Sequence, residues 1–251
     1  MKTIIKVLVL ALFVFASCTV KNSKEDAKKV TETVEIESTQ KSTKEIDESL
    51  PTIGLLMYDR VLMTEVTAPM DVFSKHTEAG DTLFNVITIA ETLDPVETEE
   101  GLVVVPDFTF DTAPKLDVLF VPSAYDMWTA VRNEKLVNFI IEKNKETTYT
   151  VSNCGGAQLI GKSGIASGKK IVTWIGGGEQ LQKDYPDLLV QNDAEVSFVT
   201  DGKFYSSNGN LASYISSLEL LEKMTSKEQR LFVESYLYLD RLKDWDFNEQ
   251  K

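Results

Sequence analysis

One cysteine, Cys154, stands where the sequence most strongly indicates a reactive group. It follows the run T-Y-T-V-S (148–152), which is rich in strand-forming residues and is predicted to be a buried strand, and it precedes the helical pattern 155–161. The two glycines and the alanine that come next leave room for the sharp turn on which an exposed nucleophile sits. Free N–H groups at a helix start favour a thiolate, so we expect a lowered thiol pKa. A buried cysteine is also often only a small apolar residue.

The other cysteine, Cys18, lies near the N-terminus. Residues 1–17 have the layout of an export signal, with two lysines, the apolar run 7–15 and a small pair before the cysteine. That run is shorter than the roughly 20 residues that span a bilayer. The letters V-F-A-S-C resemble the bacterial lipobox, which implies cleavage before Cys18 and a lipid on it. An ordinary signal peptide, or a short membrane anchor, is the alternative.

Residues 18–50 are rich in Lys, Glu, Thr and Ser and poor in large apolar side chains, so we predict a disordered polar tether. The polar and charged residues 23–26 resemble tracts that send lipoproteins to the outer face of the outer membrane. We therefore expect localisation at the cell envelope, anchored by lipid at Cys18 and facing the periplasm or the surface. The formal net charge of −13 argues against a nucleic-acid partner, which needs a clustered basic surface.

From residue 51 onward, strand-like and helix-like patterns alternate, which predicts parallel βαβ units in one domain over 51–225 and a helical extension over 226–251. Strands are expected at 52–57, 83–90, 101–105, 117–121, 148–152 and 170–173, with a hairpin at 196–206. Helices are expected at 65–79, 131–143, 155–161, 179–184, 211–224 and 226–242. A turn after a parallel strand lies at the carboxyl edge of the sheet, where ligands bind.

Five segments carry recognisable motifs. They read G-L-L-M-Y-D with M-T-E-V-T-A-P-M-D-V-F (54–73), D-V-L-F-V-P-S-A (117–124), S-N-C-G-G-A (152–157), I-A-S-G-K-K-I-V-T-W (165–174) and D-G-K-F-Y-S-S-N-G-N-L-A-S-Y-I-S (201–216). In this order they resemble the ThiJ/PfpI superfamily, within the class I glutamine-amidotransferase-like fold. The first segment is most similar to the branch of isonitrile hydratases and AraC-type regulators. The resemblance implies an α/β fold, a flavodoxin-like three-layer sandwich with a mainly parallel sheet and a cysteine nucleophile elbow.

The resemblance also implies roles for residues near the elbow. The acid that contacts the thiol in the family falls on Glu65, where it would share a proton with the sulfur or act as general acid and base. A carboxylate in the first turn of a helix is otherwise simply favoured there. Ser123 and Ala124 fall where the family forms an oxyanion pocket from backbone N–H groups, although here they replace two glycines.

Three further positions are expected at the pocket through the same resemblance. Gly155 follows the cysteine, Trp174 ends the fourth segment, and Asn208 lies in a short turn before the last core helix. Packing alone is the alternative for Trp174, because aromatic side chains near a cleft are more often packing residues.

The chain departs from the family in its histidines. Peptidase and amidase members place one beside or near the elbow cysteine, and the hydratase-like branch often has one after the following strand; here Gly155 and Trp174 stand there. The sequence has 1 histidine, His76, expected on the same helix as Glu65 and about 16 Å further along its axis. Peptidase activity is therefore not expected. A lone histidine with scattered carboxylates predicts no metal site.

Three classes of function stay open. The first is a Cys/Glu hydratase or lyase acting on a small electrophile, such as an isonitrile or, as in glyoxalase-like relatives, a reactive carbonyl. The second is a non-catalytic domain that binds or senses a small ligand. The third is a redox sensor or chaperone-like protein that uses reversible oxidation of Cys154. No cofactor is expected, and the expected partners are a small molecule, the membrane through Cys18 and a second copy in a homodimer.

Overall fold

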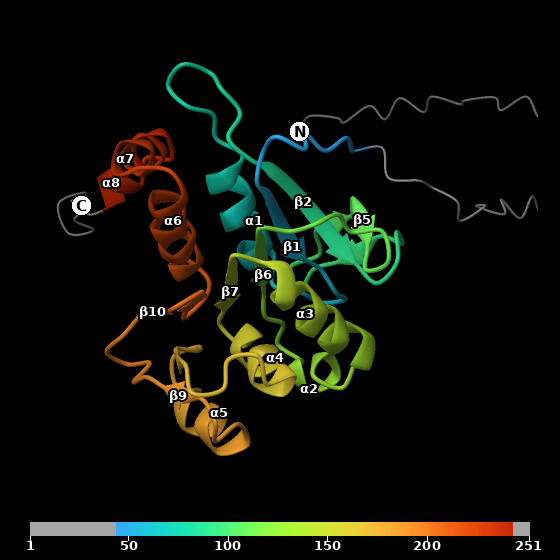
Figure 1. The fold of residues 1–251 in the computed structure, drawn as a ribbon. Helices are drawn as coiled ribbons and strands as arrows, with labels where there is room; N and C mark the ends of the chain where they lie inside the picture. Colours follow the sequence, from blue (N-terminus) through green and yellow to red (C-terminus); the bar gives the residue numbers. More distant parts are fainter. Residues whose placement is uncertain (1–43, 243–251) are drawn as a thin grey trace, which may run out of the picture. The chain divides into compact units, whose positions relative to one another are not determined.

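The computed structural model describes residues 44–242, whose centre is one mainly parallel sheet (Figure 1). Within these residues the sheet has seven strands in the order β10-β11-β7-β6-β1-β2-β5. Its neighbouring pairs are parallel, except that β10 and β11 form an antiparallel hairpin. The strands are β1 (Thr52–Leu56), β2 (Asn85–Ala90), β5 (Phe108–Thr109), β6 (Val118–Val121), β7 (Tyr149–Asn153), β10 (Phe198–Asp201) and β11 (Phe204–Ser207).

Helices follow most of these strands, as expected for βαβ units. They are α1 (Met63–Phe73), α2 (Met127–Ala130), α3 (Glu134–Glu146), α4 (Gly156–Ser163), α5 (Gly178–Asp184), α6 (Ala212–Met224), α7 (Lys227–Tyr236) and α8 (Leu239–Leu242). Two short strand pairs lie outside the main sheet: β3 (Val96–Glu97) with β4 (Val103–Val104), and β8 (Lys170–Ile171) with β9 (Leu189–Val190).

The sheet is covered on both faces because its central strands are apolar on both. In β1, Ile53 and Leu55 belong to the core that includes α1 and α6, whereas Leu56 belongs to the core that includes α3 and α4. In β6, Phe120 and Val121 divide between the same two cores. Successive side chains of a strand point to opposite faces. This alternation builds three layers, helix, sheet and helix, and it confirms the predicted flavodoxin-like sandwich.

Helix α1 ends at Phe73, so the expectation that it runs to Ala79 was wrong. Residues 77–81 form a turn instead, in which the Thr77 N–H donates to the Asp81 carbonyl oxygen over 3.0 Å and Gly80 has a φ of 93°. A positive φ breaks a right-handed helix and suits glycine. The strands expected at 101–105 and 170–173 are also shorter, and only Val103–Val104 and Lys170–Ile171 are paired.

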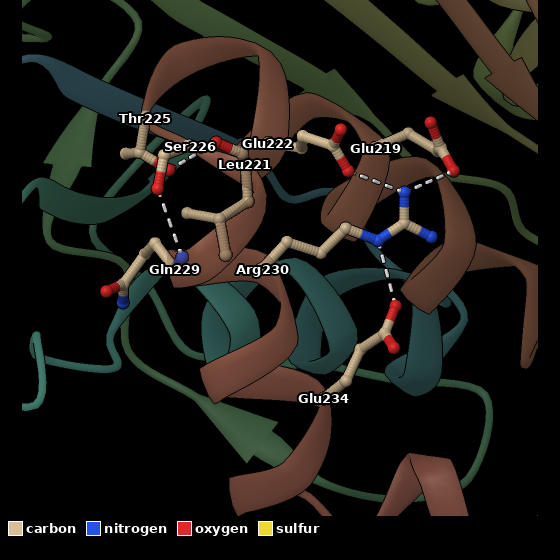
Figure 2. A network of polar contacts seen from close by, with 8 residues as sticks. All are labelled: Glu219, Leu221, Glu222, Thr225, Ser226, Gln229, Arg230 and Glu234. Atoms are coloured by element: carbon tan, nitrogen blue, oxygen red, sulfur yellow. Dashed lines mark hydrogen bonds and ion pairs between the residues drawn. The ribbon is translucent and has the colours of Figure 1, made fainter.

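The described part of the C-terminal extension packs on α6. Ser226 caps α7 by accepting the Gln229 N–H, and Val233 is fully buried in the core that contains α6. The Arg230 guanidinium joins the two helices through carboxylates on both of them (Figure 2). Its contacts are Glu219 at 2.7 Å, Glu222 at 3.0 Å and Glu234 at 2.8 Å. The extension is therefore docked on the domain as far as Leu239, which packs against the same core.

The expected export signal, Cys18 and most of the expected tether lie outside the described residues. Residues 44–50, which the composition assigned to the tether, contact the domain: the Asp47 N–H donates to Asn85 Oδ1 over 3.0 Å, and Lys44 pairs with Asp107 at 3.1 Å. No helix within residues 44–242 is both long enough and apolar enough to cross a membrane.

Candidate functional site

Four neighbouring strands end at the candidate site. The order β11-β7-β6-β1 places their carboxyl ends side by side at one edge of the sheet. The segments that follow them supply Gly209 after β11, Cys154 after β7, Ser123 after β6 and, on helix α1 after β1, Glu65. Parallel strands thus gather residues from four distant parts of the sequence, at the edge where ligands bind in such sheets.

Cys154 occupies a strained turn between β7 and α4. Its φ is 52°, in the left-handed region that residues with a side chain rarely adopt. The turn is fixed by two contacts: the Cys154 N–H donates to the Ser207 carbonyl oxygen over 2.9 Å, and the Thr173 hydroxyl donates to the Cys154 carbonyl oxygen over 2.8 Å. Strain held by its surroundings is typical of functional sites. The structure therefore has the nucleophile elbow that the sequence predicts.

The glycines after the cysteine are required by close packing against the end of β6. A Cβ on Gly156 would lie 2.2 Å from the Val121 carbonyl oxygen, so no side chain fits there. A Cβ on Gly155 would lie 2.5 Å from Ser123 Oγ. These contacts bring the start of α4 and the loop after β6 together, directly beside the cysteine.

Beneath the elbow, β7 ends in a buried polar network. Asn153 is fully buried, and its Oδ1 accepts the hydroxyls of Ser207 over 2.7 Å and Ser216 over 2.9 Å. Buried polar groups need such partners, and Asn153 Oδ1 has two, whereas its Nδ2 has none among the described residues. The residue before the cysteine is thus anchored to both β11 and α6.

Glu65 is fully buried in the first turn of α1. Its Oε2 accepts the Ser123 N–H over 2.7 Å. Its Oε1 has no hydrogen bond of normal geometry. This oxygen lies beside Gly209 and Cys154: a Cβ built on Gly209 would be 2.3 Å from Glu65 Oε1 and 2.3 Å from Cys154 Cβ. A thiol is only a weak donor. One carboxyl oxygen is therefore satisfied by the backbone, and the other is directed at the cysteine.

Cys154 and Glu65 change each other's proton affinity. Burial, which penalises the charged form, raises the pKa of Glu65 from 4.5 to about 7, although the Ser123 N–H acts against it. Burial, and after it the Glu65 charge, raises the pKa of the Cys154 thiol to about 12. Coupled groups titrate as a pair. Between these two values the pair holds a single proton.

The expectation of a lowered thiol pKa was therefore wrong. The Gly155 N–H at the start of α4 does act in the expected direction on Cys154. Its effect is smaller than that of burial and of the adjacent carboxylate. Between the two pKa values the proton of the pair lies on sulfur, and the charged Glu65 beside it is a group that can accept this proton.

Tyr58, which directly follows β1, also lies at the pair. Its hydroxyl donates to the Pro122 carbonyl oxygen over 2.7 Å. Burial raises the pKa of Tyr58, and the negative charges of Glu65 and Cys154 add to this effect. The phenol therefore stays neutral and forms part of the wall around the pair.

Both backbone N–H groups expected to form an oxyanion pocket have partners. Ser123 donates its N–H to Glu65, and Ala124 donates its N–H to Met127 Sδ over 3.2 Å. An oxyanion between them would have to displace both acceptors. Their predicted role in an oxyanion pocket stays a prediction.

The remaining predicted residues lie in two segments. Asn208 is buried and donates Nδ2–H to the Thr173 carbonyl oxygen over 2.6 Å, so it supports the segment whose Thr173 hydroxyl contacts Cys154. Trp174 is half-buried, and its indole lies so close to Gly177 that a Cβ there would be 2.1 Å from the ring. This contact matches the packing interpretation of Trp174.

His76 lies beyond the end of α1 and is exposed, with its Nδ1 3.3 Å from the Thr82 hydroxyl. Within residues 44–242 no group of three or more His, Cys, Asp or Glu side chains is placed to hold a metal ion.

Of the three further site residues Tyr58, Thr173 and Gly209, sequence reasoning placed only Gly209 near the elbow, in the turn that also holds Asn208. A usable signal existed for two of them. Tyr58 follows β1, and Gly209 follows β11, so both stand after strands adjacent to those of the expected site. Thr173 stands in an irregular segment whose contact with the elbow has no mark in the sequence.

A sequence model of the DJ-1/PfpI family matches residues 52–223 of this chain. The isonitrile hydratase of Pseudomonas putida is 26% identical over 189 residues, which are 74% of this chain and 77% of that protein.

Two solved structures share the fold. A ThiJ/PfpI family protein from Pseudomonas syringae has a TM-score of 0.68 at 20% identity, covering 80% of this chain and 84% of the other. An AraC family transcriptional regulator from Pseudomonas putida has a TM-score of 0.63 at 17% identity, covering 74% of this chain and 99% of the other. At these identities the likeness concerns the fold alone.

Proposed function

Because the chain belongs to the DJ-1/PfpI family, we propose that it is a hydratase in which Cys154 and Glu65 add water to a small neutral electrophile of the isonitrile type. The observation that carries this proposal is the pair of the half-buried, strained Cys154 and the fully buried Glu65, which share one proton. The similarity to an isonitrile hydratase supports the choice of substrate class.

The proposed reaction needs one nucleophile and one proton carrier. The Cys154 sulfur bonds to the terminal carbon of the isonitrile while the shared proton moves to that carbon, which gives a thioimidate. Water then adds to the same carbon, with Glu65 accepting its proton. The carbon–sulfur bond breaks, the substrate nitrogen and the sulfur each end with a proton, and the product is an N-substituted formamide. The site needs no redox step, and Glu65 is regenerated.

The positions of the backbone donors favour this substrate over amides. Amide hydrolysis builds an oxyanion that needs preorganised donors. The Ser123 and Ala124 N–H groups, which would serve it, already donate to Glu65 and Met127. Attack on an isonitrile carbon creates no oxyanion in its first step. The arrangement therefore suits an electrophile without a carbonyl oxygen.

The charge around the pair favours a neutral substrate. Glu99 and Glu100 reach the loops on either side of Glu65, where they accept the N–H groups of Tyr125 and Met63. The Glu100 carboxylate would repel an anion, whereas the charge of Glu99 is offset by its ion pair with Arg60. Redox sensing is less well supported, because a sensor thiol is usually exposed and has a low pKa, whereas burial raises that of Cys154.

Turnover assays test the proposal. We expect the full-length protein to convert a small alkyl isonitrile to the formamide, and both Cys154→Ser and Glu65→Gln to lose this activity while remaining folded. Methylglyoxal is the comparison substrate, since its attack does create an oxyanion. Activity retained in Cys154→Ser, or turnover of methylglyoxal but not of the isonitrile, would overturn the proposal.

We also propose that a lipid on Cys18 holds the protein at the cell envelope. The arrangement of lysines, apolar run and small residues before Cys18 supports this. Cys18→Ala is expected to move the protein from the membrane fraction to the soluble fraction, and unchanged membrane association would contradict the proposal. The expected homodimer stays a prediction, which sedimentation velocity of the protein tests.

A further inference from the structure

The hairpin formed by β3 and β4 reaches the two loops that position the Cys154–Glu65 pair. Its loop, residues 98–102, is closed by the Thr98 N–H, which donates to the Leu102 carbonyl oxygen over 2.8 Å. Thr98 is fully buried, so the loop is fixed rather than extended into solvent. Thr98 is followed by two glutamates, Glu99 and Glu100. Their carboxylates contact different segments of the site, since Glu99 accepts the Tyr125 N–H and Glu100 accepts the Met63 N–H.

Glu99 joins the segment after β1 to the loop after β6. Its Oε2 pairs with Arg60 at 2.8 Å, and its Oε1 accepts the Tyr125 N–H over 3.3 Å. Its own N–H donates to the Val61 carbonyl oxygen over 3.0 Å. The side chain of Glu99 is 9% exposed, whereas that of its partner Arg60 is 47% exposed. Glu99 is thus held at three points, by Arg60, by the Tyr125 N–H and, through its own backbone N–H, by Val61.

The loop after β6 is the one that carries the Ser123 N–H. Tyr125 stands two residues after Ser123, and the intervening Ala124 forms an isolated bridge with Val61. Leu62 also donates its N–H to the Ser123 carbonyl oxygen over 2.8 Å. Through Tyr125 and Val61, Glu99 therefore fixes the backbone donor of Glu65 from both sides.

Glu100 acts on the start of helix α1, which carries Glu65. Helix α1 begins after Leu62, which provides no side-chain cap, and the Glu100 Oε2 instead accepts the Met63 N–H over 2.9 Å. A carboxylate at this end satisfies a helix donor and suits the helix dipole. Glu65 lies two residues further along the same turn. The orientation of Glu65 therefore depends on a cap supplied by the hairpin.

We propose that Glu99 and Glu100 are positioning residues for the Cys154–Glu65 pair, with Glu99 holding the Ser123 donor and Glu100 holding the start of α1. This proposal rests on the proposed function because both assign a role to the same two residues, Cys154 and Glu65. Thiol alkylation reads the pair directly and needs no substrate. A failure of isonitrile turnover and a failure of positioning are therefore distinguishable.

The two glutamates should act on Glu65 in opposite directions. The ionisable groups that face Glu65 are Cys154 from the elbow, Tyr58 from the segment after β1 and Glu100 from the hairpin. The Glu100 charge raises the pKa of Glu65, whereas the Ser123 N–H, which Glu99 keeps in place, lowers it.

The experiment follows alkylation of Cys154 by iodoacetamide across pH in the full-length protein. Glu100→Gln keeps an acceptor for the Met63 N–H but loses the charge, so the midpoint of the first rise in rate should fall by about half a pH unit. Glu99→Ala releases the Tyr125 loop, so the midpoint should rise by about the same amount. Glu99→Gln keeps the acceptor for Tyr125 and should restore most of the wild-type profile.

Glu97→Gln is the matched control, because Glu97 lies in the same hairpin and contacts Arg60 at 3.4 Å with a side chain that is 56% exposed. Its midpoint should not change. A purely structural role would lower the melting temperature and leave every midpoint unchanged, and that result would overturn the proposal. Shifts of both variants in the same direction would overturn it too. If Glu99→Ala does not fold, the test depends on Glu100→Gln, and an unchanged pH midpoint of alkylation in that variant would overturn the proposal.

Discussion

Cys154 and Gly209 are in such close contact that a Cβ at position 209 would lie 2.3 Å from the Cys154 Cβ and 2.3 Å from Glu65 Oε1. The contact brings the loop after β11 onto the elbow and closes one side of the pair. Gly209 has a φ of 84°, so its backbone conformation also suits glycine. The turn before α6 is thus part of the site as much as the elbow itself.

Gly209→Ala should therefore disturb both stability and thiol chemistry. The positive φ alone costs about 1–2 kcal/mol, and the clash with Cys154 and Glu65 adds about 1–3 kcal/mol. Urea unfolding measures the total. Gly202→Ala is the matched control, since Gly202 has a φ of 64° but no atom closer than 3.9 Å to its Cβ position. Equal losses of stability, or unchanged Cys154 alkylation in Gly209→Ala, would contradict this description of the contact.

The two glycines of the elbow should differ in their tolerance of a side chain. Gly156→Ala meets the Val121 carbonyl oxygen, which is backbone and cannot rotate away, so we expect a loss of several kcal/mol or no folded protein. Gly155→Ala meets Ser123 Oγ, which can change rotamer. It should fold, with a loss of about 1 kcal/mol. Thermal unfolding of the two variants tests the order, and a more stable Gly156→Ala would reverse it.

The buried Glu65 should make stability fall as pH rises. The pKa of Glu65 is about 7 in the folded protein, whereas its ordinary value, which applies to the unfolded protein, is 4.5. Between pH 4.5 and about 7 the folded protein therefore binds a proton on Glu65 that the unfolded protein has lost. Below pH 4.5 both states are protonated and the effect is absent; above about pH 7 the full cost, about 3 kcal/mol, remains. Other carboxylates titrate as well, so the informative quantity is the difference between wild type and Glu65→Gln. That difference should grow from pH 4.5 to about 7 in favour of the variant. A difference independent of pH would contradict the assignment.

Arg230 should hold α7 against α6 (Figure 2). Its side chain is 24% exposed, and its guanidinium contacts Glu219 and Glu222 on α6 and Glu234 on α7. Arg230→Met would remove the cation that these carboxylates share, so we expect a loss of about 2 kcal/mol and faster hydrogen exchange in α7. Lys145→Met, in an exposed pair with Glu142, is the control and should change stability by less than about 0.5 kcal/mol. Unchanged exchange in α7 would show that the network does not hold the helix.

The layers of the fold could be read from the sequence because each strand has a local pattern. The runs at 52–57 and 117–121 are apolar on both faces, which is typical of central parallel strands, and they form β1 and β6. The motif order also placed Cys154 and Glu65 at one edge. What it could not place were short strands such as β5 and β9, whose pairing depends on distant partners rather than on their own residues.

The proton affinity of the pair could not be read from the sequence for a physical reason. A helix start next to Cys154 is visible in the letters G-G-A, and it favours a thiolate. Burial and the neighbouring charge of Glu65 act in the opposite direction and are larger, but both depend on tertiary packing. The same holds for the hairpin glutamates Glu99 and Glu100, whose N–H donors on Tyr125 and Met63 lie in segments far away in the chain.

The central claim is that Cys154 and Glu65 share one proton, and the pH dependence of alkylation tests it most directly. The modification of the Cys154 peptide by iodoacetamide is followed by mass spectrometry, which separates it from Cys18. In the wild type the rate should rise with a midpoint near the Glu65 pKa of about 7 and again toward the thiol pKa of about 12. Glu65→Gln should lose the first rise, and Glu97→Gln should keep it. A first rise that persists unchanged in Glu65→Gln would contradict the shared proton.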